Sequence, residues 1–168
     1  MSPLYLVPDL FGPPGGIARY CRMVCRALIA SGASLTTLAL QDQDGAAAEA
    51  ADVFPTMRYR PCRRRRARFV LEALLALRSR PTTILVGHPN FALLGWLLAR
   101  LSSAQLVVFM YGVEVWAPMT GLRRRALRRA DRWIAISRFT ARRAAEANHL
   151  PLDQIRILHN CLDPHFAR

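Results

Sequence analysis

The stretch Asp9-Leu-Phe-Gly-Pro-Pro-Gly-Gly-Ile-Ala-Arg-Tyr20 decides how this chain folds. It follows a short apolar run, Leu4–Val7, that is typical of a strand, and it precedes a helical pattern that begins near Ile17. A strand, a glycine-rich turn and a helix N-terminus in that order bring backbone N–H groups to face an anion. Pro13-Pro14 stiffen the approach, while Gly15-Gly16 permit positive φ and keep Cβ atoms away from a ligand.

The same glycines have a second interpretation, a turn between strand and helix that needs small residues only for packing. Their spacing matches neither the G-x-G-x-x-G of dinucleotide-binding proteins nor the G-x-x-x-x-G-K-[ST] of P-loop proteins. The turn alone therefore does not name a ligand, and a functional prediction has to come from several loops together.

The length of 168 residues suits a single domain over residues 1–168 that can bury a sizeable core. A hydrophobic fraction of 52% excludes a disordered chain. The four cysteines form no C-x-x-C pair, and neither they nor the four histidines cluster at ligand spacing, so we expect a reducing compartment and no metal.

The chain carries no segment that predicts export or membrane insertion. No basic stretch precedes Pro8 and Asp9, which is unlike a signal peptide. The longest apolar runs, Phe91–Ala99 and Leu106–Val113, are shorter than the ~20 residues that span a bilayer. We expect a cytoplasmic protein that is soluble or peripheral to a membrane.

The net charge of +13 comes from 24 basic residues, all of them arginine. Two clusters hold many of these residues: Arg58, Arg60, Arg63, Arg64, Arg65, Arg66 and Arg68 form one, and Arg123, Arg124, Arg125, Arg128, Arg129 and Arg132 form the other. Such clusters attract phosphates on lipids, nucleotides or nucleic acids. A solvated basic face, or an arginine bias in codon usage, explains the same composition without a ligand.

Apolar runs of strand length alternate with helical patterns along the chain. Strands are expected at 4–7, 34–40, 57–60, 82–86, 105–110, 132–136 and 155–158, and helices at 17–30, 64–79, 91–101, 122–130 and 138–147, with an alanine-rich turn of helix ending at 52. This alternation predicts an α/β fold, a Rossmann-like doubly wound parallel sheet in a single domain. Arg63–Arg66 are expected in the first turn of the helix at 64–79. The positive end of the helix dipole repels arginines there, and a bound anion would relieve this repulsion.

Ligands of such sheets bind beyond the carboxyl ends of the strands. Polar loop residues follow the expected strands there: the Gly15-Gly16 turn, His88-Pro89-Asn90, Tyr111–Glu114, Ser137 and Asn160. Each loop alone is a weak signal, but their convergence on one rim predicts a ligand site.

Several of these residues together resemble a known family. Gly15-Gly16-Ile17 with Arg19, a strand ending in His88, and Tyr111-Gly-Val-Glu-Val-Trp116 resemble the N-terminal half of family 4 glycosyltransferases of GT-B fold. Ala130–Thr140 looks like the family's AD-x-x-I-A-V-S-x-F-T segment, and Ile155–Asp163 with Phe166 resembles K-I-x-V-I-x-N-G-V-D-x-x-x-F. The resemblance runs from about Tyr5 to Phe166, which is essentially the whole chain.

The resemblance implies one half of a two-domain enzyme. Family members transfer a hexose-like sugar from a nucleotide-sugar donor to an acceptor with retention, usually without a metal. The N-terminal domain chiefly receives the acceptor, and the C-terminal domain binds the nucleotide and carries an E-x7-E motif. No E-x7-E occurs in this sequence. We therefore expect the C-terminal domain to be absent from this chain, to be supplied in cis or in trans, and to be needed for any sugar transfer.

The resemblance also assigns roles residue by residue. Gly15 and Gly16 would let the backbone approach the donor diphosphate. Acceptor binding would fall to His88, Asn90 and Arg19, and catalysis to Glu114 and Tyr111, with Glu114 holding a hydroxyl near the reaction centre. Each role has an alternative: His88 packs beside Pro89, Glu114 pairs with an arginine, and Tyr111 is a packed aromatic.

Two positions depart from the family pattern. Tyr111-Gly112 stands where the family commonly has His-Gly, and a phenol with a pKa near 10 is a poor base at neutral pH. Asn160-Cys161 replaces the common Asn-Gly, which puts a positive φ there in doubt.

The arginines suggest where the protein works. Acceptors of the family are often lipid-linked, or polysaccharides, and an anionic bilayer attracts each nearby arginine by ~1 kcal/mol. We expect Arg63, Arg64, Arg65, Arg66 and Arg68 to dock on the inner face of the cytoplasmic membrane, alone or with Arg123–Arg129. The alternative is a non-enzymatic basic Rossmann-like module, regulatory or associated with nucleic acid. Because the arginines are not interleaved with stacking aromatics, we expect no nucleic-acid partner.

Overall fold

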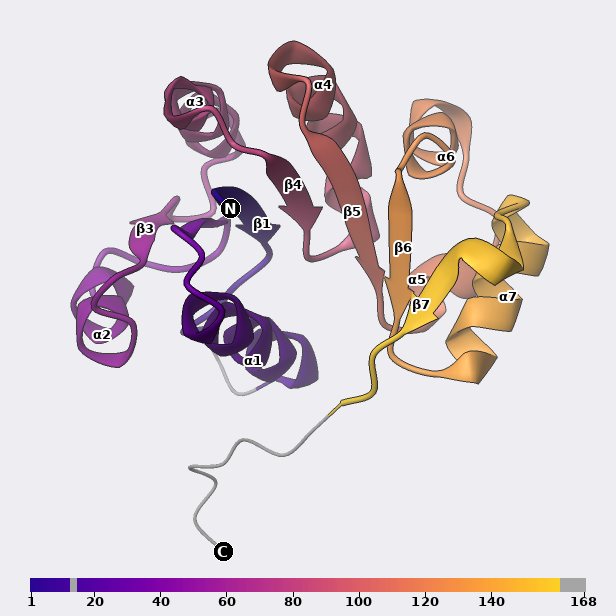
Figure 1. Ribbon diagram of the computed structural model, residues 1–168, viewed down its shortest axis with the longest axis horizontal. Helices are drawn as coiled ribbons and strands as arrows, with labels where there is room; N and C mark the ends of the chain where they lie inside the picture. Colours follow the sequence, from indigo (N-terminus) through magenta and orange to yellow (C-terminus); the bar gives the residue numbers. More distant parts are fainter. Residues whose placement is uncertain (13–14, 161–168) are drawn as a thin grey trace, which may run out of the picture.

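The computed structural model describes residues 1–12 and 15–160, which form one parallel sheet flanked by helices (Figure 1). The strands are β1 (Pro3–Val7), β2 (Thr36–Ala39), β3 (Arg58–Pro61), β4 (Thr83–Val86), β5 (Gln105–Met110), β6 (Arg132–Ala135) and β7 (Ile155–Ile157). The helices are α1 (Gly16–Ala30), α2 (Ala46–Val53), α3 (Arg66–Ala76), α4 (Ala92–Ser102), α5 (Val113–Trp116), α6 (Gly121–Leu127) and α7 (Arg138–Asn148). Three 3₁₀ turns, η1 (Leu77–Ser79), η2 (Pro89–Phe91) and η3 (Leu152–Gln154), complete the described elements.

The sheet has the order β3-β2-β1-β4-β5-β6-β7, and every neighbouring pair is parallel. This order confirms the predicted α/β fold, a Rossmann-like doubly wound sheet in a single domain. Its central strands are buried on both sides, which is why they read as continuous apolar runs: all five residues of β1 and all four of β4 are buried.

Helices cover both faces of the sheet and divide the core into two layers. In Figure 1, α3, α4 and α6 lie along one face, and α1 and α2 lie along the other. Phe69 of α3 and Leu98 of α4 belong to the first apolar cluster, together with Ala141 of α7. Tyr20 and Val24 of α1 belong to the second. The doubly wound arrangement therefore leaves the loops at the ends of the strands free to form a site.

Local signals fixed several helix ends as predicted. Helix α1 ends before Ser31-Gly32, and Gly32 has the positive φ of 78° that favours glycine after a helix. The hydroxyl of Ser137 accepts a hydrogen bond from the Thr140 N–H at 3.1 Å, so Ser137 is the N-cap of α7. The short helix α5 was not predicted, because its four residues follow Gly112 directly and show no period.

One prediction about the arginines is wrong. Arg63 and Arg64 lie in the loop before α3 instead of in its first turn, and both have left-handed backbone conformations, with φ of 55° and 59°. Their N–H groups donate to the carbonyls of Asp42 at 2.9 Å and Leu40 at 2.7 Å, so the loop is tied to the end of β2. Helix α3 begins only at Arg66.

Candidate functional site at the carboxyl edge of the sheet

The loops that leave the strands gather at one edge of the sheet, as predicted. All strands are parallel, so the segments after β1, β4, β5 and β6 start from the same edge. The chain passes from β1 to β2 in one direction and returns to β4 on the other side of β1. This change of direction between β1 and β4 is the point where ligands of doubly wound sheets bind.

The glycine turn after β1 leads directly into the N-terminus of α1. Gly15 is the N-cap in an extended conformation, with φ of −149° and ψ of 152°, and Gly16 is the first helical residue. Among the described residues no side chain caps this end, and the first turn holds no acidic residue. A Cβ on Gly16 would meet nothing within 4 Å. Without a side-chain cap among the described residues, the positive end of this helix favours an anion, and a Cβ-free Gly16 leaves space beside it.

The backbone conformation and the packing of the two glycines differ from what a tight turn requires. Neither Gly15 nor Gly16 adopts a positive φ, so the conformational freedom that glycine permits is not used at this turn. Because Gly16 has open space above it, close packing does not explain the absence of a side chain either. The expected stiffening by Pro13-Pro14 lies outside the described residues.

A buried carboxylate, that of Asp42, fixes the first part of the same loop. Asp42 follows β2 and is 3% exposed. Its Oδ2 accepts the N–H groups of Leu10 at 2.9 Å and Phe11 at 3.0 Å, and also the hydroxyl of Tyr59. Burial, and then the charge of Asp42, raises the pKa of the neighbouring Asp9. Asp42 therefore positions the loop that leads to the glycines.

His88 stands at the end of β4, after a tightly packed glycine. A Cβ on Gly87 would lie 3.0 Å from side-chain atoms of Tyr5 and Val7. The Nδ1 atom of His88 accepts the N–H of Asn90 at 3.2 Å, so the neutral ring carries its proton on Nε2. Burial lowers the pKa of His88. The imidazole is therefore a neutral hydrogen-bond donor near pH 7.

Glu114 supports the loop after β5. Its Oε1 accepts the N–H groups of Gly112 at 2.9 Å and Tyr111, which holds the start of α5. The partners of Oε1 are thus backbone N–H groups and not the arginine of the predicted alternative. The charge of Glu114 partly opposes the fall in the pKa of His88.

The side chain of Tyr111 points toward helix α1. Its hydroxyl lies 3.5 Å from the Sγ of Cys21, and its ring meets the ring of Tyr20 edge to face at 5.4 Å. Burial raises the pKa of Tyr111 well above its ordinary value. The phenol therefore packs against α1 as a protonated group, in agreement with the packed-aromatic alternative.

A hollow of about 390 Å³ opens beside His88 on the side of α3 and α4. His88 and Asn90 line it together with two arginines that come from different helices, Arg66 of α3 and Arg123 of α6. Its apolar wall is formed by Leu40, Phe69, Val70, Phe91 and Leu94. We call this space the rim hollow. It combines two cationic groups with an apolar surface, next to a neutral imidazole.

The structure separates the remaining predicted residues from this hollow. Arg19 lies on the first turn of α1, which packs on the opposite face of the sheet from α3. Arg63 forms an exposed ion pair with Asp44 at 3.2 Å, and Arg68 lies 3.9 Å from the same carboxylate. Of the predicted membrane-docking arginines, Arg66 alone lines the hollow among the described residues. Sequence reasoning did not join it to His88, because the two are distant in the chain.

In the described ranges, no three His, Cys, Asp or Glu side chains gather as a set of metal ligands. None of the described helices combines the length and the apolar character that a bilayer span requires.

Comparison with known proteins assigns the chain to a class. The model of the Glycosyltransferase Family 4 matches residues 14–166, which is most of the chain, and the chain therefore belongs to this family. The family and GT-B fold expected from the sequence are confirmed. No curated protein sequence matches the chain.

Solved structures show the same fold at low sequence identity. Anabaena Alr3699/HepE in complex with UDP-glucose superposes with a TM-score of 0.70 at 14% identity, over 97% of this chain and 44% of that one. The lipopolysaccharide outer core galactosyltransferase WaaB gives 0.62 at 13% identity, over 99% and 47%. Arabidopsis thaliana UGT89C1 with UDP gives 0.59 at 12%, over 97% and 50%. The chain thus spans half or less of the length of these enzymes.

Proposed function

We propose that this chain is the acceptor-side domain of a retaining hexosyltransferase that takes a sugar from a nucleotide-sugar donor. A second, nucleotide-binding domain, in cis or in trans, completes the cleft. The observation that carries the proposal is the meeting, at one sheet edge, of an uncapped helix N-terminus, a neutral His88 and the carboxylate of Glu114. The UDP and UDP-glucose bound in crystals of the similarly folded HepE support a nucleotide-sugar donor.

Each group at the edge has a task in this proposal. The N–H groups at the start of α1 stabilise the negative charge that develops on the departing diphosphate, and Gly15 and Gly16 leave room for it. His88 donates a hydrogen bond from Nε2 to a sugar or acceptor oxygen. Glu114 holds the loop after β5 and accepts from a substrate hydroxyl. No metal enters the proposal.

The rim hollow indicates what kind of acceptor fits. Arg66 and Arg123 present guanidinium groups that bind phosphate in a bidentate manner, and the apolar wall offers a surface for hydrocarbon. A phosphate-linked lipid carries both chemistries in one molecule. We therefore propose a lipid-linked glycan acceptor that is held with its phosphate between these two arginines.

Nucleotide-sugar turnover tests the proposal. The chain alone is expected to transfer no sugar, whereas the chain together with the nucleotide-binding domain of its enzyme is expected to be active. In that active form, Gly16→Val and His88→Ala are each expected to lower kcat/KM on the order of 100-fold, because they block the diphosphate or remove a donor. The exposed Arg142→Gln on α7 is the control and should have no effect.

The pH dependence of the same assay checks the role of His88. Burial lowers its pKa, so the ring is neutral at pH 7. Protonation at pH values below the ordinary pKa of about 6.5 leaves the Nε2 donor but ends the hydrogen bond that Nδ1 accepts from the Asn90 N–H, so activity should fall there as the ring loses its orientation. His88→Ala should abolish this acidic limb. Turnover by the chain alone, or full activity of Gly16→Val, would contradict the assignment.

We also propose that the helix layer of α3, α4 and α6 docks on an anionic membrane. Four leucines on the outer side of α3 and α4 are exposed: Leu71 by 56%, Leu74 by 44%, Leu97 by 46% and Leu101 by 68%. Figure 1 shows these two helices side by side on one face of the sheet, with α6 next to α4. Arginines also lie in the loop before α3, and α6 contains Arg123, Arg124 and Arg125. An apolar surface flanked by arginines is typical of interfacial binding.

Vesicle sedimentation measures this docking. The chain is expected to bind vesicles of phosphatidylcholine with phosphatidylglycerol, to bind neutral phosphatidylcholine vesicles poorly, and to be released by salt. Leu71→Ser with Leu74→Ser, and separately Arg64→Gln with Arg65→Gln, should each weaken binding about tenfold. Arg142→Gln with Arg143→Gln on α7 is the matched control. Equal binding to neutral and anionic vesicles would rule out the docking model.

A further inference from the structure

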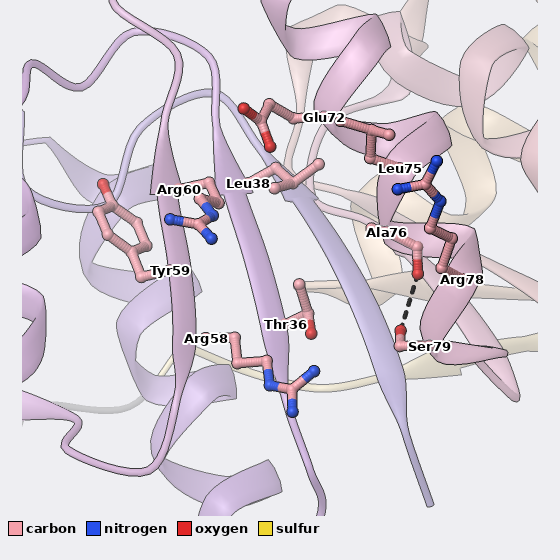
Figure 2. A pocket seen from close by; sticks show the side chains of 10 residues that line it. All are labelled: Thr36, Leu38, Arg58, Tyr59, Arg60, Glu72, Leu75, Ala76, Arg78 and Ser79. Carbon is pink, nitrogen blue, oxygen red and sulfur yellow. Dashed lines mark hydrogen bonds between the residues drawn. The ribbon is translucent and has the colours of Figure 1, made fainter.

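A second hollow, of about 540 Å³, lies over the edge strand β3, away from His88 and the glycine turn. Helix α3 packs beside β2, and α2 packs against β3 on the opposite face of the sheet. The face of β3 on the α3 side is therefore left open. Figure 2 shows the hollow, with β3 forming one wall and the end of α3 with η1 forming the other. We call it the β3 groove.

The strand register brings arginines into this groove. Arg58 pairs with Thr36 and Arg60 with Leu38, so the two arginines share a face with Leu38, whose side chain packs in the core under α3. Tyr59, between them, turns to the other face, where its hydroxyl donates to Asp42. The two-residue period of a strand thus places both guanidinium groups on the open side.

Arg78 approaches from the opposite wall. It lies in η1 at the end of α3, and in Figure 2 Thr36 and Leu38 lie between it and the two arginines of β3. All three arginines are exposed. Within the described part of the chain, none of the three has an ion-pair partner within 4 Å. The lining of the groove therefore carries three guanidinium groups and one carboxylate, that of Glu72, and this net positive charge attracts an anion.

The other groups of the groove restrict which anion fits. Glu72 adds one carboxylate, which accepts hydrogen bonds from the hydroxyl groups that sugars carry and that a polyphosphate lacks. The hydroxyl of Ser79 donates to the Ala76 carbonyl at 2.7 Å and keeps its lone pairs for a ligand, and Leu75 offers an apolar wall. The ring of Tyr59 packs against Phe11 at 5.6 Å and gives no platform for a nucleobase.

We propose that the β3 groove binds an acidic oligosaccharide, a chain of sugars that carry carboxylates. Guanidinium groups bind carboxylates with two parallel hydrogen bonds, while Glu72, Thr36 and Ser79 take the sugar hydroxyls. The groove follows the four residues of β3, roughly 13 Å, so it accommodates several sugar units. The site goes beyond the proposed transferase function and does not require sugar transfer in order to exist.

Fluorescence anisotropy with a labelled tetragalacturonate tests the site on the chain itself at 150 mM NaCl. The acidic probe is expected to bind, and a neutral maltotetraose probe is expected to bind at least tenfold more weakly. Arg58→Gln with Arg60→Gln should raise the Kd at least tenfold, and Arg78→Gln should raise it severalfold. The exposed pair Arg142→Gln with Arg143→Gln removes the same charge elsewhere and should leave the Kd nearly unchanged.

A third variant separates sugar recognition from simple attraction of charge. Glu72→Gln is expected to strengthen binding of polyphosphate more than binding of the galacturonate probe, because both anions lose a repelling carboxylate but only the sugar also loses a strong acceptor for its hydroxyl groups. Equal binding of neutral and acidic probes, or an unchanged Kd in the Arg58/Arg60 variant, would overturn the proposal. Tighter binding of a single-stranded oligonucleotide than of galacturonate would overturn it as well. These assays contain no donor sugar, so their result is independent of the transferase proposal.

Discussion

Replacing Asp42 by alanine is expected to lower the free energy of unfolding by about 3 to 4 kcal/mol. The carboxylate is 3% exposed and accepts three hydrogen bonds, from the N–H groups of Leu10 and Phe11 and from the hydroxyl of Tyr59. The substitution leaves these donors without a partner in a buried place. Chemical denaturation followed by circular dichroism measures the loss.

The chain supplies two controls for this experiment. Asp44→Ala removes an exposed carboxylate from the same loop, whose ion pair with Arg63 contributes about 0–1 kcal/mol. Tyr59→Phe removes one of the three donors and should cost about 1 kcal/mol. If Asp42→Ala were as mild as Asp44→Ala, Asp42 would not be what holds the loop before the glycines.

Replacing Gly95 by valine is expected to destabilise the fold by about 3 kcal/mol. Glycine in a helix interior normally costs about 1 kcal/mol relative to alanine, so its presence in α4 needs a reason. A Cβ at this position would lie 2.4 Å from the Cγ2 of Val86 and 3.0 Å from the Cδ1 of Leu106. The helix can therefore approach β4 and β5 only without a side chain here.

The comparison that isolates this contact is Gly16→Ala. Gly16 is also helical, but a Cβ there meets nothing within 4 Å, so this substitution should leave the unfolding free energy unchanged or slightly raised. Equal stability of the Gly95→Val and Gly16→Ala proteins in the same denaturation assay would show that α4 has room to move away from the sheet.

The sequence predicted the sheet well because its signals are local. The strand at 105–110 and the cap at Ser137 follow from a run of apolar residues and from one hydroxyl. The loop at Arg63 and Arg64 was mispredicted because its left-handed conformation is held by carbonyls of the preceding strand's end, which no local pattern reveals.

The site was predicted in part for the same reason. His88 follows β4 and Glu114 follows β5. Because the carboxyl ends of parallel strands lie at the same edge of a sheet, the sequence was enough to predict that both residues lie at this edge. The joining of His88 with Arg66 and Arg123 depends on how α3 and α6 pack across α4, which is a tertiary property. The inward turn of the Tyr111 hydroxyl depends on Cys21 in α1, ninety residues away.

The position of β1 in the middle of the sheet governs how this chain reaches its native state. β1 lies between β2 and β4, and the Ser2 N–H donates to the hydroxyl of Thr82, 80 residues along the chain. During synthesis, β1 therefore has one free edge after β2 has emerged and until β4, about 80 residues further along the chain, has also been made. During that interval a chaperone that covers extended apolar segments would protect it from pairing with other nascent chains.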